Sequence, residues 1–270
     1  MSYYTSLNGL RNAQTELSVI ANNLANAETT GFKRSRPNFS DMVASAAGMG
    51  PRHAKGIGAT VQSIDQNFAF GPIQQTGRAL DLAINGEGFF CKIDPTNNKT
   101  YFTRNGHLGL DGNGYVVDPN GSRLQIRPVD AAGNVTSTTL QDAQAPMFNA
   151  AGSEFVSVTV ETDGTVGASY ADASVVKIGK VALAFFNSPN GLLQVGNQDW
   201  LATEISGNAR FGNPGEGRLG NLLTGSLEQS NVDIAEEMVG LITAQRYFQA
   251  NAKAIDTATQ LSQTIINLRS

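Results

Sequence analysis

The sequence predicts an α+β fold in which a long α-helix at each end of the chain flanks a central all-β domain. Two observations predict it. Apolar residues recur at alternating spacings of four and three in both terminal segments, the heptad pattern of long packed helices. Between these segments, glycine-rich turns separate short runs of β-type residues. We expect the terminal helices to form a coiled-coil-like axial core.

The first predicted helix lies within residues 1–30. Its stripe consists of Tyr3, Leu7, Leu10, Gln14, Leu17, Ala21 and Leu24. Only Gln14 interrupts the apolar character of this stripe. Residues 27–31 supply turn formers and end in Gly31, so the helix should end near Asn26.

The second predicted helix lies within residues 230–270. Asp233 is among several N-cap candidates, and Glu236 and Glu237 fall in the first turn, where the helix dipole favours acidic side chains. The stripe consists of Ile234, Met238, Leu241, Gln245, Phe248, Ala252, Ile255, Thr259, Ser262 and Ile266. A second apolar row consists of Ile255, Ala258, Leu261, Ile265 and Leu268. A helix over residues 234–268 would be roughly 50 Å long.

The central β-rich domain is predicted over residues 71–229. Its strand-like runs are 80–84, 88–93, 99–104, 115–118, 123–128, 155–161, 175–178, 180–186 and 199–203. Turn sequences such as Asp163-Gly164 lie between them and favour antiparallel hairpins. We therefore expect a small sandwich or an irregular barrel. Residues 130–152 are poor in core-forming side chains and are predicted to form a surface loop.

An extended connector is predicted over residues 31–70, between the first helix and the β-rich domain. Residues 38–43 fit either a short helical or an extended piece. Residues 44–55 are small, polar and rich in glycine, as loops are. The chain is thus expected to have four parts, with boundaries near residues 30, 70 and 229.

The charge and the cysteine content argue against several classes of function. The formal net charge is −4, whereas a nucleic-acid-binding domain usually presents a basic face. The one basic cluster, Lys33, Arg34 and Arg36, is expected to be a solvated loop. Cys91 is the only cysteine, so it can form no internal disulfide and is expected to be a small buried hydrophobe.

The sequence also contains no metal-binding, membrane-spanning or catalytic motif. His53 and His107 are the only histidines, too few for a Cys/His metal site. His107 also has no nucleophile beside it, so we expect no catalytic residue and no cofactor. No apolar run is long enough to span a membrane. The N-terminal sequence lacks the features of a secretory signal peptide, so export would require another route.

The apolar stripes of the terminal helices need to be covered. Burying about six large side chains is worth on the order of 10–15 kcal/mol as an upper estimate. The two helices can cover each other only in part, and the second row on the C-terminal segment indicates more than one contact face. Neighbouring copies of the chain are the natural cover. The alternative is a self-contained monomer whose helices pack on the β-rich domain, such as a binding module.

Six stretches of the sequence, at both ends and at the start of the β-domain, resemble the bacterial flagellar rod and hook proteins. Residues 21–33 are similar to the N-terminal signature of that family, which includes Asn22, Asn23, Asn26, Gly31 and Phe32. Residues 76–90 and 101–106 resemble the family's entry into its β-domain. Residues 225–233, 236–239 and 244–251 resemble its return to the axial helix. Together these motifs cover roughly half of the chain.

The resemblance implies a structural protein rather than an enzyme. Such proteins leave the cell through the flagellar type III export apparatus and stack helically, with the terminal helices lining the channel and the β-domains forming the outer tube. It implies a homopolymer in the hook or basal body that meets other axial proteins at the rod and hook–filament junctions and is assembled under a hook cap. Neither nucleic acid nor membrane insertion is expected. The implied subunit interface comprises Leu7, Leu10, Leu17, Leu24, Ile234, Met238, Leu241, Phe248, Ile255, Leu261, Ile265 and Leu268.

Within the family, the chain is most similar to a short hook protein, with a distal or proximal rod protein as the alternative. Residues 56–61 and 70–77 resemble hook proteins, and the connector lacks the longer insertion typical of the distal rod. The short middle of the chain, which leaves no room for an additional outer domain, instead resembles a rod subunit. The sequence leaves open the helical parameters, the curvature and the neighbours that each helix face contacts.

Overall fold

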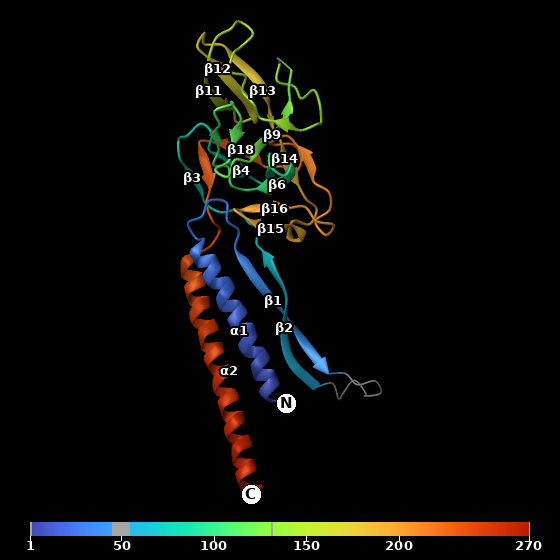
Figure 1. Ribbon diagram of the computed structural model, residues 1–270, viewed down its shortest axis with the longest axis vertical. Helices are drawn as coiled ribbons and strands as arrows, with labels where there is room; N and C mark the ends of the chain where they lie inside the picture. The colour runs from blue at the N-terminus through green and yellow to red at the C-terminus, as the bar shows by residue number, and fades with distance from the viewer. Residues whose placement is uncertain (1, 45–54, 131, 270) are drawn as a thin grey trace. The chain divides into compact units, whose positions relative to one another are not determined.

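The terminal helices and the central β-rich region agree with the predicted α+β class (Figure 1). The computed structural model describes residues 2–44, 55–130 and 132–269. Helix α1 spans Ser2–Ala25 and helix α2 spans Ile234–Arg269. Both start and end within a few residues of the predicted bounds. Neither described helix carries an apolar stretch long enough to cross a membrane.

The chain divides into two compact units. The first unit contains Met1–Ala27, Arg34–Asn67 and Val232–Ser270, and the second contains Glu28–Lys33 and Phe68–Asn231. Both helices belong to the first unit, although they lie at opposite ends of the sequence. The second unit is therefore inserted, in sequence, within the first.

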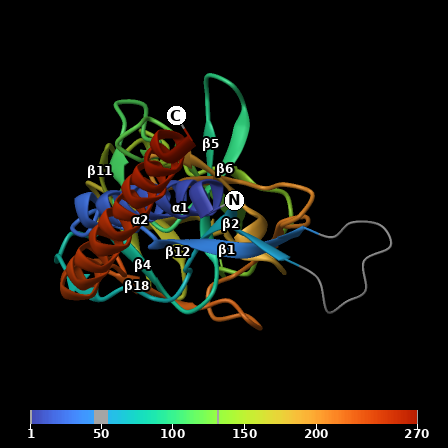
Figure 2. The ribbon, with the colours of Figure 1, turned by 90° about the horizontal axis from the view of Figure 1, so that it is seen from below.

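The first unit combines the two helices with a long β-hairpin. Strands β1 (Ser35–Ala44) and β2 (Lys55–Gln66) pair antiparallel, side by side (Figure 2). This hairpin occupies most of the predicted connector, and residues 38–43 are extended rather than helical. The predicted loop at residues 44–55 lies outside the described residues except for its two ends, which are strand residues. Helix α1 packs against α2 and also against the hairpin.

The second unit is built of short strands. They are β3 (Ile73–Gln75), β4 (Leu82–Asn85), β5 (Phe89–Asp94), β6 (Lys99–Thr103), β7 (Gly109–Leu110), β8 (Val116–Val117), β9 (Arg123–Pro128), β10 (Gln141–Asp142), β11 (Phe155–Val160), β12 (Thr165–Tyr170), β13 (Val175–Val181), β14 (Leu183–Phe185), β15 (Leu193–Gly196), β16 (Asp199–Leu201), β17 (Arg210–Gly212), β18 (Asn221–Thr224) and β19 (Ser226–Glu228). Every pair of these strands is antiparallel, as the turn sequences predict.

One branched sheet holds most of these strands. Its main path runs β11-β12-β13-β9-β5-β6-β16-β15, and the shorter strands β7, β8, β10, β14 and β17 pair alongside it. Among the described residues this path ends at β11 and β15 without closing, so it differs from the irregular barrel that was one of the expected forms. Two further pairs, β18-β4 and β19-β3, form separate two-stranded sheets, and β4 and β18 contribute side chains to the larger hydrophobic cluster.

Strand β5 contributes to both hydrophobic clusters of the second unit because its side chains alternate between two faces. Phe90 lies in the larger cluster with residues of β9, β12 and β13. Phe89 and Cys91 lie in the smaller cluster with Phe102 and Trp200. Cys91 is fully buried, as predicted, and burial raises the pKa of its thiol.

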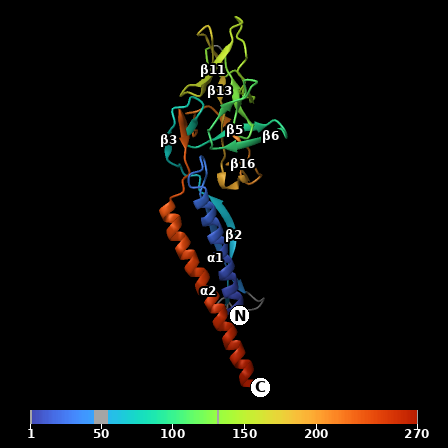
Figure 3. The same ribbon diagram turned by 60° about the vertical axis from the view of Figure 1, so that its left-hand side comes forward.

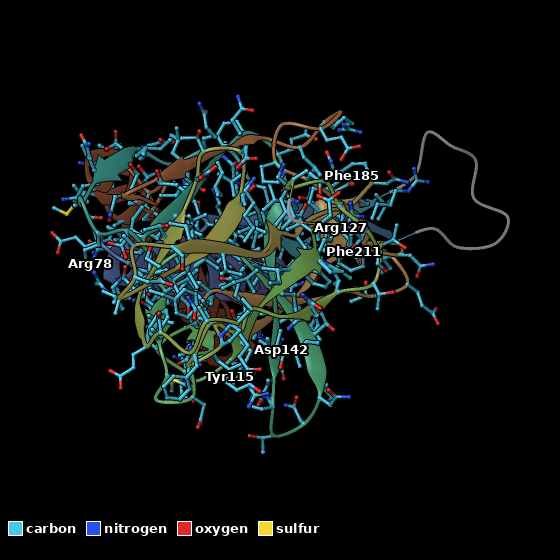
Figure 4. All side chains as sticks on the ribbon, turned by 90° about the horizontal axis from the view of Figure 1, so that it is seen from above. Arg78, Tyr115, Arg127, Asp142, Phe185 and Phe211 are labelled. Carbon is cyan, nitrogen blue, oxygen red and sulfur yellow. The ribbon has the colours of Figure 1, made fainter. Side chains whose placement is uncertain are left out.

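The prediction of a surface loop over residues 130–152 is wrong for residues 141–145, whereas residues 146–152 are mostly exposed. Ala143 and Ala145 are buried in the larger cluster, and strand β10 pairs with β9. The carboxylate of Asp142 accepts a hydrogen bond from Arg123, whose guanidinium lies 3.8 Å from the ring centre of Tyr115. Figure 4 labels Asp142 and Tyr115. Ala143 and Ala145 are small enough to pack where two backbone segments lie close together. A lack of large apolar residues therefore does not by itself indicate that these two positions are exposed.

An arginine links two other branches of the same sheet. The guanidinium of Arg127 on β9 donates a hydrogen bond of 2.9 Å to the carbonyl oxygen of Phe211 on β17 (Figure 4). This bond connects strands that do not pair with each other. The branched sheet is therefore held together by side-chain bonds as well as by its ladders.

Candidate subunit interface on the terminal helices

Helices α1 and α2 pack side by side and antiparallel (Figures 1 and 3). Two glycines allow a close approach. A Cβ at Gly9 would lie 2.6 Å from Oδ1 of Asn251, and a Cβ at Gly240 would lie 3.4 Å from Cδ1 of Ile20. Gly9 lies opposite Asn251, and Ile20 lies opposite Gly240. Because the helices run antiparallel, the start of α1 at Ser2 therefore lies level with about residue 258 of α2.

The last part of α2 therefore extends past the end of α1. The two helices have 36 and 24 residues, a difference of about 18 Å at about 1.5 Å per residue. The overhang carries large apolar side chains, and each is more than 60% exposed. They are Leu261, Ile265, Ile266 and Leu268. No described residue of the chain covers this apolar surface.

A second exposed apolar surface lies on the first half of α2. It consists of Ile234, Met238, Val239, Ile242 and Tyr247. These residues recur at intervals of one to five positions and remain between 48% and 65% exposed. Monomeric proteins seldom leave such continuous apolar rows uncovered, so this face is suited to a contact with another polypeptide.

The predicted interface residues fall into two groups. Ile234, Met238, Leu261, Ile265 and Leu268 are exposed and available to a partner. The half-buried group is Leu7, Leu10, Leu17, Leu24, Leu241, Phe248 and Ile255. The half-buried group contributes to packing within the first unit and retains part of its surface for other contacts.

The most deeply buried helix residues were missed by the apolar stripe. They are Ala13, Val19, Ile20 and Asn23 on α1, and Glu237 and Ala244 on α2. On α1, positions 9, 13, 16, 20 and 23 also alternate by four and three, one row away from the predicted stripe. A search for large apolar residues does not find this row, because it contains glycine, alanine and polar residues. Its small side chains are the signal that could have identified the contact face.

A polar cluster joins the end of α1 to the start of β1 and α2. The amide of Asn23 donates to the carbonyl oxygen of Ser35 at 2.8 Å and to the carboxylate of Glu237 at 3.2 Å. Its own oxygen accepts the backbone N–H of Ser35 at 2.9 Å. Nε of Arg34 lies 2.6 Å from the buried carboxylate of Glu237. Asn23 therefore has a specific structural role that an exposed asparagine would lack.

The other two asparagines of the motif behave differently. The side-chain amide of Asn26 donates to the carbonyl oxygen of Asn22 at 2.9 Å, one turn earlier, which satisfies a carbonyl near the end of α1. Asn22 itself is exposed. The three asparagines thus divide between a buried connection, a helix end and a free surface position.

In the second unit, Gly31 occupies a position that only glycine fits well. Its φ is +72°, and a Cβ there would lie 2.7 Å from the backbone nitrogen of Asn105. Its N–H donates to the carbonyl oxygen of Glu228 at 2.8 Å. The next residue, Phe32, is buried.

The expectation that Lys33 belongs to a solvated basic loop is wrong. Lys33 is 1% exposed, and its Nζ lies 2.5 Å from Oε1 of Glu228. Arg104, also buried, lies 3.3 Å from Oε2 of the same carboxylate. Burial lowers the pKa of Lys33, while Glu228 opposes that shift. A charge run in the sequence gives no sign of a buried partner nearly two hundred residues away.

Three segments of the chain match described protein families. Residues 4–33 match the family described as flagella basal body rod protein, residues 83–168 the flagellar hook protein FlgE/F/G D1 domain, and residues 223–268 the flagellar basal body rod FlgEFG protein C-terminal region. A "flagellar basal-body rod protein FlgG" of Bacillus subtilis is 36% identical over 282 residues, covering 99% of this chain and 98% of the relative. The chain belongs to the flagellar rod and hook protein family.

Hook proteins of this family are also similar over the whole chain. A "flagellar hook protein FlgE" of Salmonella typhimurium is 26% identical over 411 residues, covering all of both proteins. A rod protein FlgG of Borreliella burgdorferi is 30% identical over 280 residues, covering 98% of this chain and 97% of the relative. These relatives are named as rod and hook proteins of the flagellum.

Proposed function

We propose that this flagellar protein is a structural subunit that assembles with copies of itself through its terminal helices. The observation that carries the proposal is the overhang of α2, whose four large apolar side chains have no cover among the described residues. Identical copies can cover such surfaces by contacts between unlike faces, and contacts of this kind generate helical tubes when they do not close into a ring. The predicted interface residues on both helices would form the inner part of that tube.

The rod is the better-supported position for this subunit. The relatives named rod protein align over 280 and 282 residues, close to the 270 residues of this chain. The alignment with the hook protein of Salmonella typhimurium runs over 411 residues, so that hook protein has a large part without a counterpart here. We therefore favour a rod subunit, which would form a stiff section of the axial structure.

The hook is the second candidate, supported by the 26% identical alignment, which reaches both ends of the hook protein, and by the similarity of residues 56–61 and 70–77 to hook sequences. In that position the subunit would form the flexible joint that passes torque from motor to filament, and its assembly would involve a hook cap. In either position, we expect export through the flagellar type III apparatus, contacts with other axial proteins and a place in the basal body or on the cell surface.

A matched pair of α2 variants tests the proposed assembly surface. Ile265→Asp places a charge on the apolar overhang, whereas Gln263→Asp places the same charge on an exposed polar position nearby. Losing the burial of one isoleucine should raise the critical concentration for polymerisation by at least ~10-fold. Sedimentation of the assembled fraction measures this effect. If both variants polymerise equally well, the overhang is not part of the subunit interface.

Electron microscopy of the purified polymer distinguishes the two positions in the flagellum. A rod subunit should give straight, stiff tubes, and a hook subunit should give curved ones. A motility assay adds an independent check, because the gene should restore swimming to a strain lacking its rod protein and not to one lacking its hook protein. Curved tubes and rescue of the hook mutant would overturn the preference for the rod.

A further inference from the structure

A lysine and two aspartates meet inside the second unit. Lys92 lies on β5, Asp199 on β16 and Asp118 between β8 and β9, and all three are at least nine-tenths buried. Nζ of Lys92 contacts Oδ2 of Asp118 and lies 2.7 Å from Oδ1 of Asp199. One buried ammonium group therefore faces two buried carboxyl groups.

The two carboxyl groups have different surroundings. Oδ1 of Asp118 accepts the backbone N–H groups of Asn120 at 2.9 Å and Ser122 at 2.8 Å, and its Oδ2 contacts Lys92. Burial raises the pKa of Asp199, and the charge of Asp118 adds to that shift while Lys92 opposes it. Oδ1 of Asp199 has no hydrogen bond of good geometry, although Nζ of Lys92 is close to it. Asp199 is therefore the carboxyl group more suited to be the neutral acid.

We propose that Lys92 and Asp199 form an intramolecular amide bond, with Asp118 as the proton acceptor. Asp118 takes a proton from the Lys92 ammonium, and the freed amine attacks Cγ of protonated Asp199. The tetrahedral adduct passes its remaining ammonium proton to a leaving hydroxyl, with Asp118 carrying protons between them. The C–N bond forms, one C–O bond breaks, and one water molecule leaves. Asp118 ends protonated, with the proton that came from Lys92, and loses that proton to solvent afterwards; no oxidant or cofactor takes part.

The fold supplies the conditions that this condensation needs. Reacting groups held in contact have effective concentrations that reach about 10⁵–10⁸ M, far above that of water, so amide formation becomes favourable in a dry site. The cross-strand neighbours of Lys92 are Leu124, which is buried, and Tyr101. The strands fix Lys92 and Asp199 before reaction, because β6 pairs with both β5 and β16. The turn between β8 and β9 holds Asp118, whose backbone N–H donates to the carbonyl oxygen of Ser122.

The second buried lysine of the same unit shows what the reaction requires. Lys33 and Glu228 are as close as Lys92 and Asp199, at 2.5 Å. Their third partner is Arg104 instead of a second carboxylate. A guanidinium carries only hydrogen-bond donors and accepts no proton, so this pair lacks the proton acceptor. Lys33 and Glu228 should remain an ion pair and serve as an internal comparison.

The mass of the intact chain tests the proposal. The full-length protein, purified folded and then denatured for mass spectrometry, should be lighter than its sequence by one water molecule. Digestion should give a branched peptide that joins Lys92 to Asp199. An unmodified mass would overturn the proposal, and a branch at Asp118 or between Lys33 and Glu228 would overturn the assignment of roles.

Variants separate the roles of the two aspartates. Asp118→Asn keeps an oxygen for the N–H groups of Asn120 and Ser122 but removes the proton acceptor, so the chain should fold and keep its full mass. Asp199→Asn should still react and lose one ammonia molecule instead of water, which gives a different mass. Lys92→Arg should keep its full mass. Circular dichroism checks that each variant folds, and loss of water from a folded Asp118→Asn variant would exclude Asp118 as the acceptor.

Discussion

At the scale of single residues, Glu228 is the carboxylate that balances two buried cations. It pairs with Lys33 and Arg104 and also accepts the backbone N–H of Gly71. Glu228→Gln keeps the shape but leaves two positive charges without a counter-charge. Breaking a buried ion pair in this way typically costs about 3–5 kcal/mol of stability. Urea unfolding followed by the fluorescence of Trp200, the only tryptophan, measures the loss.

An exposed glutamate in the same unit provides the control for that variant. Glu204 is exposed, and the same substitution there should change the free energy of unfolding by less than about 0.5 kcal/mol. Similar small changes for Glu204→Gln and Glu228→Gln would mean that the buried charges are compensated in another way.

Residue roles were the part of the structure least accessible to sequence reasoning. The sequence motif treats Asn22, Asn23 and Asn26 alike and does not separate their roles. In the structure, only Asn23 of the three is buried. The partner of Lys33 lies at residue 228, and periodicity carries no information about pairs so distant in sequence. Burial of Cys91 was predictable because it continues a local apolar run.

At the scale of elements, the turn between β12 and β13 should make the β-rich unit sensitive to acid. The pKa of Asp172 lies below its usual range because the hydroxyl and N–H of Ser174 and the amide of Asn149 donate to its carboxylate. A lowered pKa in the folded state stabilises the fold above the ordinary aspartate pKa of about 3.9, and that stability is lost as the pH falls.

Asp172→Asn isolates this contribution. The variant should have a lower melting temperature than the wild type at pH 7, and the two melting curves should converge as the pH falls toward 2. Differential scanning calorimetry across this range gives the comparison. A difference in melting temperature that stays constant with pH would show that the carboxylate charge plays no part. Asp130 and Asp163 also have lowered pKa values, so the variant should retain some acid sensitivity.

The elements themselves were predicted unevenly. Both helices were found because many residues repeat one local pattern, and turn sequences indicated the antiparallel strands. The hairpin β1-β2 was missed as a regular element because two register shifts, at Asn38/Phe39 and Met42/Val43, disturb its alternation. The order of strands in the branched sheet could not be derived, because pairs such as β14-β5 depend on contacts far apart in sequence.

At the scale of the whole molecule, amide hydrogen exchange in the overhang of α2 should differ between the dilute monomer and the polymer. In the dilute monomer, residues 259–268 should exchange fast because no described part of the chain packs on them. In the proposed polymer they should become protected. Strands β5, β9 and β12 should be protected in both states because they contribute to the larger cluster. Strong protection of the overhang in the monomer would contradict the proposal that copies cover it.

The division of the chain also imposes an order of events in the cell. The ribosome makes α1 first and α2 last, yet both belong to one unit, and α1 has no antiparallel partner until the residues after Ile234 have been synthesised. A nascent chain can therefore fold its β-rich middle early, but it lacks a finished surface for joining its neighbours. Chains truncated before Ile234 should therefore be unable to join a tube through paired terminal helices.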